Sequence, residues 1–166
     1  MDIKKHITAL GFVPQNGTNG IYHKIYVDYA IEIDFEKQSI NYGSDIIAES
    51  KTTQNFSQPE NFVVLECVDR LLCKGYKPQN IILEKTWPSG HGTSGRLDIC
   101  VNREDGTPYM LIECKTFGKE HNKELVRIRK DGGQLFTYFQ LSGGKADVLM
   151  LYASELKGNK FVYVNE

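Results

Sequence analysis

The sequence predicts a mixed α/β fold, in which a central sheet is covered by helices on both faces. Three observations support this prediction. A strongly apolar helical segment at 59–74 precedes three strand-like segments, a short turn joins the last two of these strands, and a second helical segment at 119–140 leads into an apolar strand at 146–153. The order helix, three strands, helix and strand is typical of a mixed sheet with a helix packed against each face.

A small extension of helix and strands is expected before this main body. Residues 1–10 are predicted to form a short helix, and Tyr, Ile and Val nearly alternate with polar residues over 21–42, which is typical of a strand ribbon. The polar stretch 43–59 is interpreted as a connector. We therefore divide the chain into an α+β ribbon extension at 1–57 and a main body at 58–166.

Each element of the main body has its own signal. Pro59 opens a helix that ends at Gly75, and apolar residues occupy nearly every direction around this helix, so that it should be largely buried. Residues 80–86 form the strand that follows. The second helical segment is expected to be broken or kinked at Gly132-Gly133, and a last strand covers 160–164.

Composition argues against several classes of protein. The formal net charge of −1 argues against coating nucleic acid through overall charge. The start MDIKKHITAL lacks the apolar stretch of a signal peptide, and the apolar run at 148–153 is too short to span a bilayer, so we expect a cytoplasmic protein without membrane contact. The cysteines form no C-x-x-C pair, so reduced, buried thiols are expected. They are Cys67, Cys73, Cys100 and Cys114.

A β-hairpin is predicted between residues 96–101 and 109–115. Asp105-Gly106 between them suits the two central positions of a type I′ turn. In that register Pro108 falls opposite Arg103, in a non-hydrogen-bonded pair that needs no N–H donor. The fit of the proline supports the register.

The same register places Asp98 directly opposite Glu113, with Lys115 on the face of Glu113. Facing like charges are destabilising, so the two carboxylates favour a cation between them. Their hard oxygens suit Mg²⁺ or Mn²⁺, which can polarise a phosphoryl oxygen and lower the pKa of a bound water. The ammonium of Lys115 could then orient the attacking water. An ordinary amphipathic hairpin with a charged, solvated face is the alternative.

Glu66 in the buried helix is a weaker candidate. It could add a third carboxylate to the site, or it could pair with Arg70 one helical turn further on. Spacing leaves both possibilities open.

A basic helical face follows the hairpin. Lys119, Lys123 and Arg127 are four residues apart and therefore line one face, which is either a solvated surface or a contact for a phosphate backbone. Gln134 and Tyr138 would extend this face. Gln134 could instead belong to a capping box that begins at Asp131, and Tyr138 could be a core residue.

The glycine-rich segment 89–95, SGHGTSG, does not fit the dinucleotide-binding motif G-x-G-x-x-G after a strand and before a helix. Nothing in the sequence matches the phosphate-binding motif G-x-x-x-x-G-K-(S/T), so no nucleotide site is expected in this chain. His91 within it is interpreted as a flexible surface residue.

Asp98, Glu113-Cys114-Lys115 and Gln134-x-x-x-Tyr138 together resemble the PD-(D/E)xK nuclease superfamily. More narrowly, they resemble its branch with a Q-x-x-x-Y element, shared by RecB-like nucleases and the R subunits of type I restriction enzymes. The segments PENFVVLECVDRLLCKGY and DGGQLFTYF are similar to the amino-terminal nuclease region of type I R proteins. The resemblance covers about 58–153. The first acid follows Leu97 instead of Pro, a departure that leaves the chemistry in place.

The resemblance implies a restriction-endonuclease-like fold and a Mg²⁺-dependent endonuclease acting on double-stranded DNA, with Mn²⁺ as a substitute ion. Asp98, Glu113 and the backbone carbonyl of Cys114 would hold the metal, and Lys115 would serve the water nucleophile. A helical glutamate that corresponds in position to Glu66 would assist. The residues that would support the site or contact DNA are Gln134, Tyr138, Lys119, Lys123 and Arg127.

The resemblance also implies partners. R subunits are long chains with an ATP-driven translocase after the nuclease, so ATP is expected only in a downstream motor, and modification and specificity subunits are expected partners. An alternative that keeps the fold is a non-catalytic nucleic-acid-binding or assembly module. Cleavage of RNA or of branched DNA is a third possibility compatible with these residues.

Overall fold

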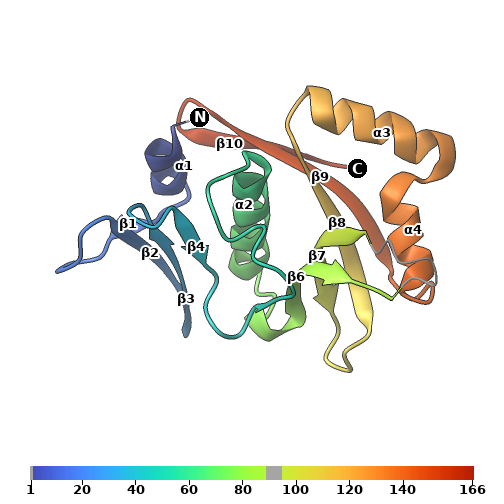
Figure 1. The fold of residues 1–166 in the computed structure, drawn as a ribbon, viewed down its shortest axis with the longest axis horizontal. Coiled ribbons are helices and arrows are strands. Elements are labelled where there is room, and N and C mark those ends of the chain that lie inside the picture. Colours follow the sequence, from blue (N-terminus) through green and yellow to red (C-terminus); the bar gives the residue numbers. More distant parts are fainter. Residues whose placement is uncertain (1, 89–94) are drawn as a thin grey trace.

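Helix α2 (Glu60–Cys73) lies between two β-sheets, as Figure 1 shows. The computed structural model describes residues 2–88 and 95–166. The smaller sheet is antiparallel and belongs to the amino-terminal part of the chain, together with helix α1 (Ile3–Ala9). Its strands, in spatial order, are β1 (Val13–Pro14), β2 (Ile21–Tyr26), β3 (Tyr29–Asp34) and β4 (Ser39–Asn41).

The larger sheet is mixed and carries the residues of interest. The pairs β5–β6 and β8–β9 are parallel, and helices lie between the two strands of each pair in the sequence. The pairs β9–β10, β6–β7 and β7–β8 are antiparallel. A short 3₁₀ helix at Pro78–Asn80 precedes β6. The six strands, in spatial order, are β10 (Lys160–Asn165), β9 (Val148–Lys157), β8 (Pro108–Thr116), β7 (Arg96–Asn102), β6 (Ile81–Thr86) and β5 (Ile47–Ala48).

The predicted helix on each face of this sheet is confirmed. Helix α2 covers one face, and a main hydrophobic core joins it to the inner face of the smaller sheet. Helices α3 (Lys119–Asp131) and α4 (Gly133–Leu141) belong to the other face, where Leu135 and Tyr138 of α4 pack on a second cluster. The break predicted between the two helices is at Gly132, whose φ of +83° is left-handed.

The all-round apolar pattern of α2 is explained by its place between two sheets. Three of its polar residues, Asn61, Glu66 and Asp69, are buried as well, so they need partners. Asp69 pairs with Lys24 and accepts a hydrogen bond from Tyr26, both on β2 of the smaller sheet. The extension is thereby attached to the main body by both apolar and polar contacts.

The stretch 43–59 is more than a connector, because it contributes β5 to the larger sheet, parallel to β6. Beyond β5, Glu49 accepts hydrogen bonds from Lys85 and from Thr86, which holds this stretch along the end of β6. The division into 1–57 and 58–166 stays a prediction, and one core extends across that boundary.

The turn of the β7–β8 hairpin differs from the predicted type I′ turn. Of the Asp105-Gly106 pair, Gly106 alone has a positive φ, at +81°. Gly106 N–H donates to the carbonyl of Arg103 at 3.0 Å, and Arg103 N–H donates to the carbonyl of Thr107 at 2.8 Å. This is a three-residue hairpin loop with one left-handed glycine. Asp105 instead uses its carboxylate to accept from Thr107 N–H at 2.9 Å.

The longer turn shifts the first strand pair. Pro108 faces Asn102, so its predicted place opposite Arg103 is wrong. An irregularity between Val101 and Asn102 then restores the predicted register, because Val101 faces Met110 as expected. One extra residue at the turn is compensated by one bulge, and the residues further along the hairpin keep their partners.

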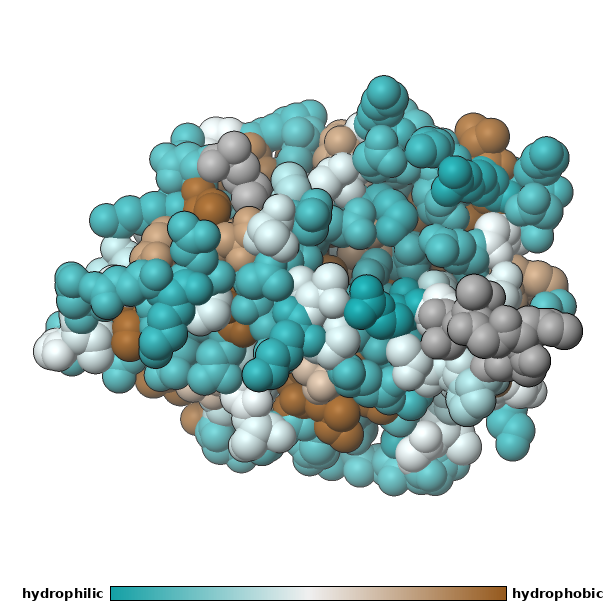
Figure 2. Space-filling model, viewed as in Figure 1, coloured by the Kyte–Doolittle hydropathy of each residue, from teal (hydrophilic) through white to brown (hydrophobic). Residues whose placement is uncertain are grey.

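The thiols are free, as predicted, but Cys73 is exposed, whereas the other three cysteines are buried. Cys73 is the last residue of α2. Among the described residues, no helix is long and apolar enough to cross a membrane. Most of the face shown in Figure 2 is hydrophilic, with small hydrophobic areas between.

Candidate functional site

Asp98, Glu113 and Lys115 line one cavity of about 530 Å³. The cavity lies where β6, β7 and β8 meet the amino-terminal end of α2, which contributes Glu60 to its wall. The side chains of the three predicted residues therefore converge on one space. They are therefore close enough to act on one bound ligand.

The cavity opens because the β7–β8 ladder stops beside it. Ile99 and Ile112 form the last backbone pair on this side. Beyond them, the backbone N–H of Cys114 donates to Oδ2 of Asp98 at 2.7 Å. A side chain thus takes the place of a ladder partner, so Asp98 and Glu113 follow the predicted register without forming a backbone pair.

Glu113 is 4% exposed, and its two oxygens have different surroundings. Oε1 accepts a hydrogen bond from Nζ of Lys115 at 2.8 Å, whereas Oε2 is buried and has no hydrogen-bond partner among the described residues. Nζ of Lys115 also donates to the carbonyl of Cys114 at 2.9 Å and lies 3.5 Å from Glu60. A buried carboxylate oxygen without a partner is costly unless a ligand satisfies it.

Burial and the neighbouring charges shift the pKa values of Asp98, Glu113 and Lys115. Burial, followed by repulsion from Glu113, raises the pKa of Asp98 well above its usual value. Burial likewise raises the pKa of Glu113, against the opposing effect of Lys115. Burial by itself lowers the pKa of Lys115, but Glu113 and Asp98 outweigh it, so the pKa of this ammonium is raised. A further cation near the carboxylates would favour their ionised forms.

The oxygen atoms at the cavity are of the kind that bind Mg²⁺. No three His, Cys, Asp or Glu side chains of residues 2–88 and 95–166 come together as a ligand set. The available oxygens are the carboxylates of Asp98 and Glu113 and the carbonyl of Cys114. Mg²⁺ is commonly bound through one or two carboxylates with several waters retained, so this set is sufficient for it.

Glu66 does not reach the cavity. It is 2% exposed, forms an ion pair with Arg70 and accepts a hydrogen bond from the hydroxyl of Tyr152. Its expected part in holding a metal is therefore wrong, and the alternative pairing with Arg70 is the one observed. The glutamate of α2 that lines the cavity is Glu60, nearly two turns earlier in the helix.

Glu84 and Arg96 also line the cavity, and sequence reasoning missed both of them. The pairs Leu83–Ile99 and Lys85–Leu97 bring Glu84 of β6 level with Asp98 of β7. Glu84 has a left-handed φ of +56°, which is unusual for a residue other than glycine. The missed signal was an acidic residue directly after the apolar run Ile81-Ile82-Leu83.

Tyr138 and Gln134 both line the cavity, although in different ways. Tyr138 is buried, and its hydroxyl donates to the carbonyl of Arg96 at 2.9 Å, so it supports the wall of the site and also belongs to the core. Gln134 is exposed at the cavity. The side chain of Asp131 accepts from the N–H of Gly133 at 3.0 Å, and no side-chain cap is found for α4, so the capping-box alternative for Gln134 is wrong.

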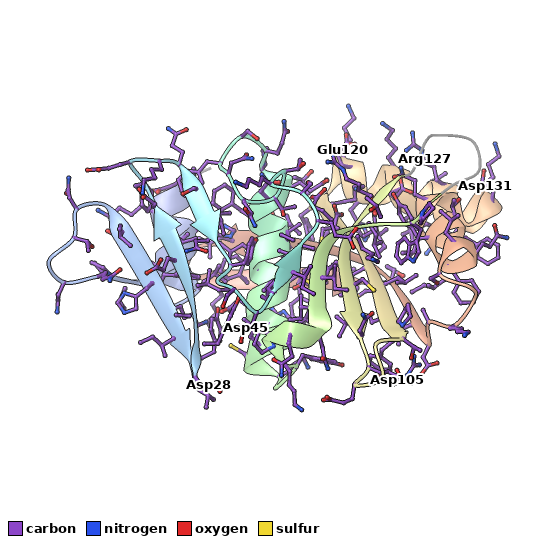
Figure 3. The ribbon with its side chains drawn as sticks, turned by 60° about the horizontal axis from the view of Figure 1, so that its bottom comes forward. Asp28, Asp45, Asp105, Glu120, Arg127 and Asp131 are labelled. Carbon is purple, nitrogen blue, oxygen red and sulfur yellow. The ribbon has the colours of Figure 1, made fainter. Side chains whose placement is uncertain are left out.

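Lys119, Lys123 and Arg127 are exposed on α3, as the spacing predicts. Lys123 lies 3.9 Å from Glu120, and Arg127 lies 3.2 Å from the buried Glu124. Figure 3 places Glu120 and Arg127 on the opposite side of the molecule from Asp105 in the hairpin turn. The prediction for His91 falls in 89–94, outside the described residues.

Comparison with known proteins assigns the family. The family model of the type I restriction enzyme R protein N terminus matches residues 59–141, which is half of the chain. The match includes the carboxylate hairpin, the basic helix and both residues of the Q-x-x-x-Y element. No curated protein matches the chain. The chain belongs to the family of the type I restriction enzyme R protein N terminus, and with it to the restriction systems.

Proposed function

We propose that this chain is a Mg²⁺-dependent endonuclease domain of the PD-(D/E)xK type, which cleaves phosphodiester bonds of double-stranded DNA. The observation that carries the proposal is the buried, unpartnered Oε2 of Glu113, in a cavity that Asp98 and Lys115 also line. A closed structural ion pair would leave neither an unsatisfied carboxylate oxygen nor a cavity beside it. Membership in the family supports a role in restriction.

Three groups of the chain would hold the metal, namely the carboxylates of Asp98 and Glu113 and the carbonyl of Cys114. When bound, Mg²⁺ supplies Lewis-acid activation of a phosphate and of a water. Lys115 donates to Glu113 and to the Cys114 carbonyl, so its ammonium is held beside both groups. Its positive charge can orient an attacking water and offset negative charge that develops on the phosphate.

The exposed basic face of α3 is suited to contact the DNA backbone without reading its sequence. Lys119, Lys123 and Arg127 all belong to it, and Gln134 on the next helix lies at the cavity wall. In the intact restriction enzyme we expect modification and specificity subunits as partners, with ATP used by a motor elsewhere in the R subunit.

Cleavage of supercoiled plasmid in Mg²⁺ at high protein concentration tests the mechanism. We expect nicking by the parent and its loss in Lys115→Ala. The matched control is Lys157→Ala, since Lys157 also lies 2.8 Å from a glutamate two residues before it, Glu155, but lies outside the cavity. Equal nicking by the parent and Lys115→Ala would remove the proposed role of Lys115.

Calorimetric titration with Mn²⁺ tests the metal site independently of activity. We expect the parent to bind the ion and Asp98→Ala to lose the signal. If the parent binds DNA but takes up no ion, the fold serves as a non-catalytic binding module and the nuclease proposal is wrong.

A further inference from the structure

Arg96 is the second basic residue of the cavity, besides Lys115. Lys115 is engaged with Glu113 and Glu60, and its side chain is 16% exposed, whereas the side chain of Arg96 is 46% exposed. The cavity also contains several carboxylates, so an incoming phosphate meets repulsion unless a cation is available. Arg96 is the better exposed of these two cationic groups.

The side chain of Arg96 is held through two of its three nitrogens. Its Nε lies 3.2 Å from Oε2 of Glu84, and its Nη1 donates to Ser50 at 3.2 Å and to Thr52 at 3.0 Å. Its Nη2 has no hydrogen-bond partner among the described residues, which leaves two N–H donors available. An arginine that is oriented through two nitrogens and keeps the third one open is prepared to bind a phosphate oxygen.

The backbone of Arg96 is fixed as well. Its carbonyl accepts the hydroxyl of Tyr138, and its neighbour in β6 is Thr86. Thr86 in turn donates to Glu49 through both its N–H and its hydroxyl, at 2.7 Å in each case. Side chains from three separate segments therefore determine where the guanidinium lies, so little ordering is required when a ligand binds.

We propose that Arg96 binds a phosphate of the DNA strand adjacent to the scissile position, and that Ser50 and Thr52 hold it in place for this contact. This proposal rests on the proposed function and adds a residue to it. It also gives the segment before residue 59 a role in the site, because Ser50 and Thr52 lie outside the family match at 59–141. Lys115 would act at the reacting phosphate and Arg96 at its neighbour.

The test is the binding of a short DNA duplex in EDTA, where no cleavage occurs, measured by fluorescence anisotropy over a range of KCl concentrations. We expect Arg96→Gln to weaken binding about tenfold and to reduce the salt slope by about one ion. Arg96→Lys should be intermediate, because it keeps the charge but loses the planar fork. Ser50→Ala combined with Thr52→Val should weaken binding without changing the salt slope.

Arg103→Gln is the matched control, because Arg103 also pairs with a carboxylate, Asp147 at 2.6 Å, and lies at the hairpin turn away from the cavity. Thermal unfolding of every variant verifies that it is folded. Unchanged affinity and salt slope in folded Arg96→Gln and Arg96→Lys would overturn the proposal, even if the parent cleaves DNA. Loss of binding in Arg96→Gln alongside a parent that never cleaves would support the phosphate contact and remove only the nuclease.

Discussion

The carboxylate of Asp98 accepts the backbone N–H of Cys114 at 2.7 Å, so one side chain both ends the β7–β8 ladder and lines the cavity. Its carboxylate therefore has a structural task that needs only an acceptor oxygen. The negative charge is a separate matter, because burial and the neighbouring Glu113 raise the pKa of Asp98 and oppose that charge. A substitution that keeps the acceptor oxygen and removes the negative charge separates the effect of the hydrogen bond from the effect of the charge.

Asp98→Asn should therefore leave the fold intact and increase the free energy of unfolding in EDTA by about 1 kcal/mol. It should abolish the stabilisation that Mg²⁺ gives to the parent, since a ligand stabilises only the state that binds it. Urea denaturation with and without Mg²⁺ measures both effects. Lower stability of the variant in EDTA would show that the charge of Asp98 is needed for folding.

The two glutamates of α2 should respond in opposite ways. Glu66→Ala leaves Arg70 and Tyr152 without their buried partner, and since Arg70 is partly exposed we expect a loss of about 2–3 kcal/mol in the free energy of unfolding. Cleavage by the folded protein should not change. Glu60→Ala should cost little stability, but it removes a carboxylate 3.5 Å from Lys115 and should lower cleavage about tenfold.

Denaturation and plasmid nicking on matched amounts of folded protein separate these effects. A loss of cleavage in folded Glu66→Ala, at normal stability, would return that residue to the site and contradict the geometry seen here.

The carboxylate hairpin could be predicted because its signals are local. Apolar residues set which face of each strand is buried. The loop is one residue longer than predicted, but the bulge between Val101 and Asn102 restores the predicted register, so Asp98 and Glu113 still lie level with each other. The predicted turn type was wrong because Asp105-Gly106 fits both a two-residue and a three-residue hairpin loop. The observed loop includes a hydrogen bond that the Asp105 carboxylate accepts from the N–H of Thr107, and no strand pattern specifies this contact.

The residues that sequence reasoning missed depend on contacts between distant segments. Glu84 reaches the cavity through the β6–β7 register, which a long connection leaves undetermined. Thr52 reaches it from the stretch that follows β5, a short strand that joins the sheet. Glu60 was not a candidate and Glu66 was, because α2 is apolar in nearly every direction and its contact with two sheets is a property of the whole fold.

Gly95 and Tyr138 should show energetic coupling. A Cβ at Gly95 would lie 2.6 Å from the Tyr138 hydroxyl, so Gly95→Ala should destabilise by about 1–3 kcal/mol. Tyr138→Phe removes the hydrogen bond to the Arg96 carbonyl and should cost about 1 kcal/mol. Without the hydroxyl the added methyl group meets a less severe contact, at 3.0 Å from Cε1.

The double variant Gly95→Ala with Tyr138→Phe should therefore lose less stability than the sum of the single variants, by about 1 kcal/mol. Urea denaturation of the four proteins completes the cycle. Strict additivity would mean that the backbone at Gly95 moves away from Tyr138 at no cost, and the predicted coupling would then be wrong.

His6 of α1 should make the protein sensitive to acid. It lies between Phe62 and Phe161, is 4% exposed, and its Nε2 is buried without a partner among the described residues. Burial lowers the pKa of His6 from 6.5 to about 4, against a smaller opposing effect of a backbone hydrogen bond with Phe62. The charged form is therefore disfavoured in the folded state.

Because the unfolded chain binds this proton more readily, the contribution of His6 is complete above about pH 6.5 and is lost as the pH falls toward 4. Between pH 7 and pH 5 the loss should be about 2 kcal/mol. His6→Phe keeps an aromatic ring between the two phenylalanines and cannot titrate, so the difference between parent and variant removes the contribution of the carboxylates. Urea denaturation across this range should give a parent curve that falls more steeply toward acid than that of His6→Phe. Parallel curves would show that His6 is protonated as easily in the folded protein as in the unfolded chain.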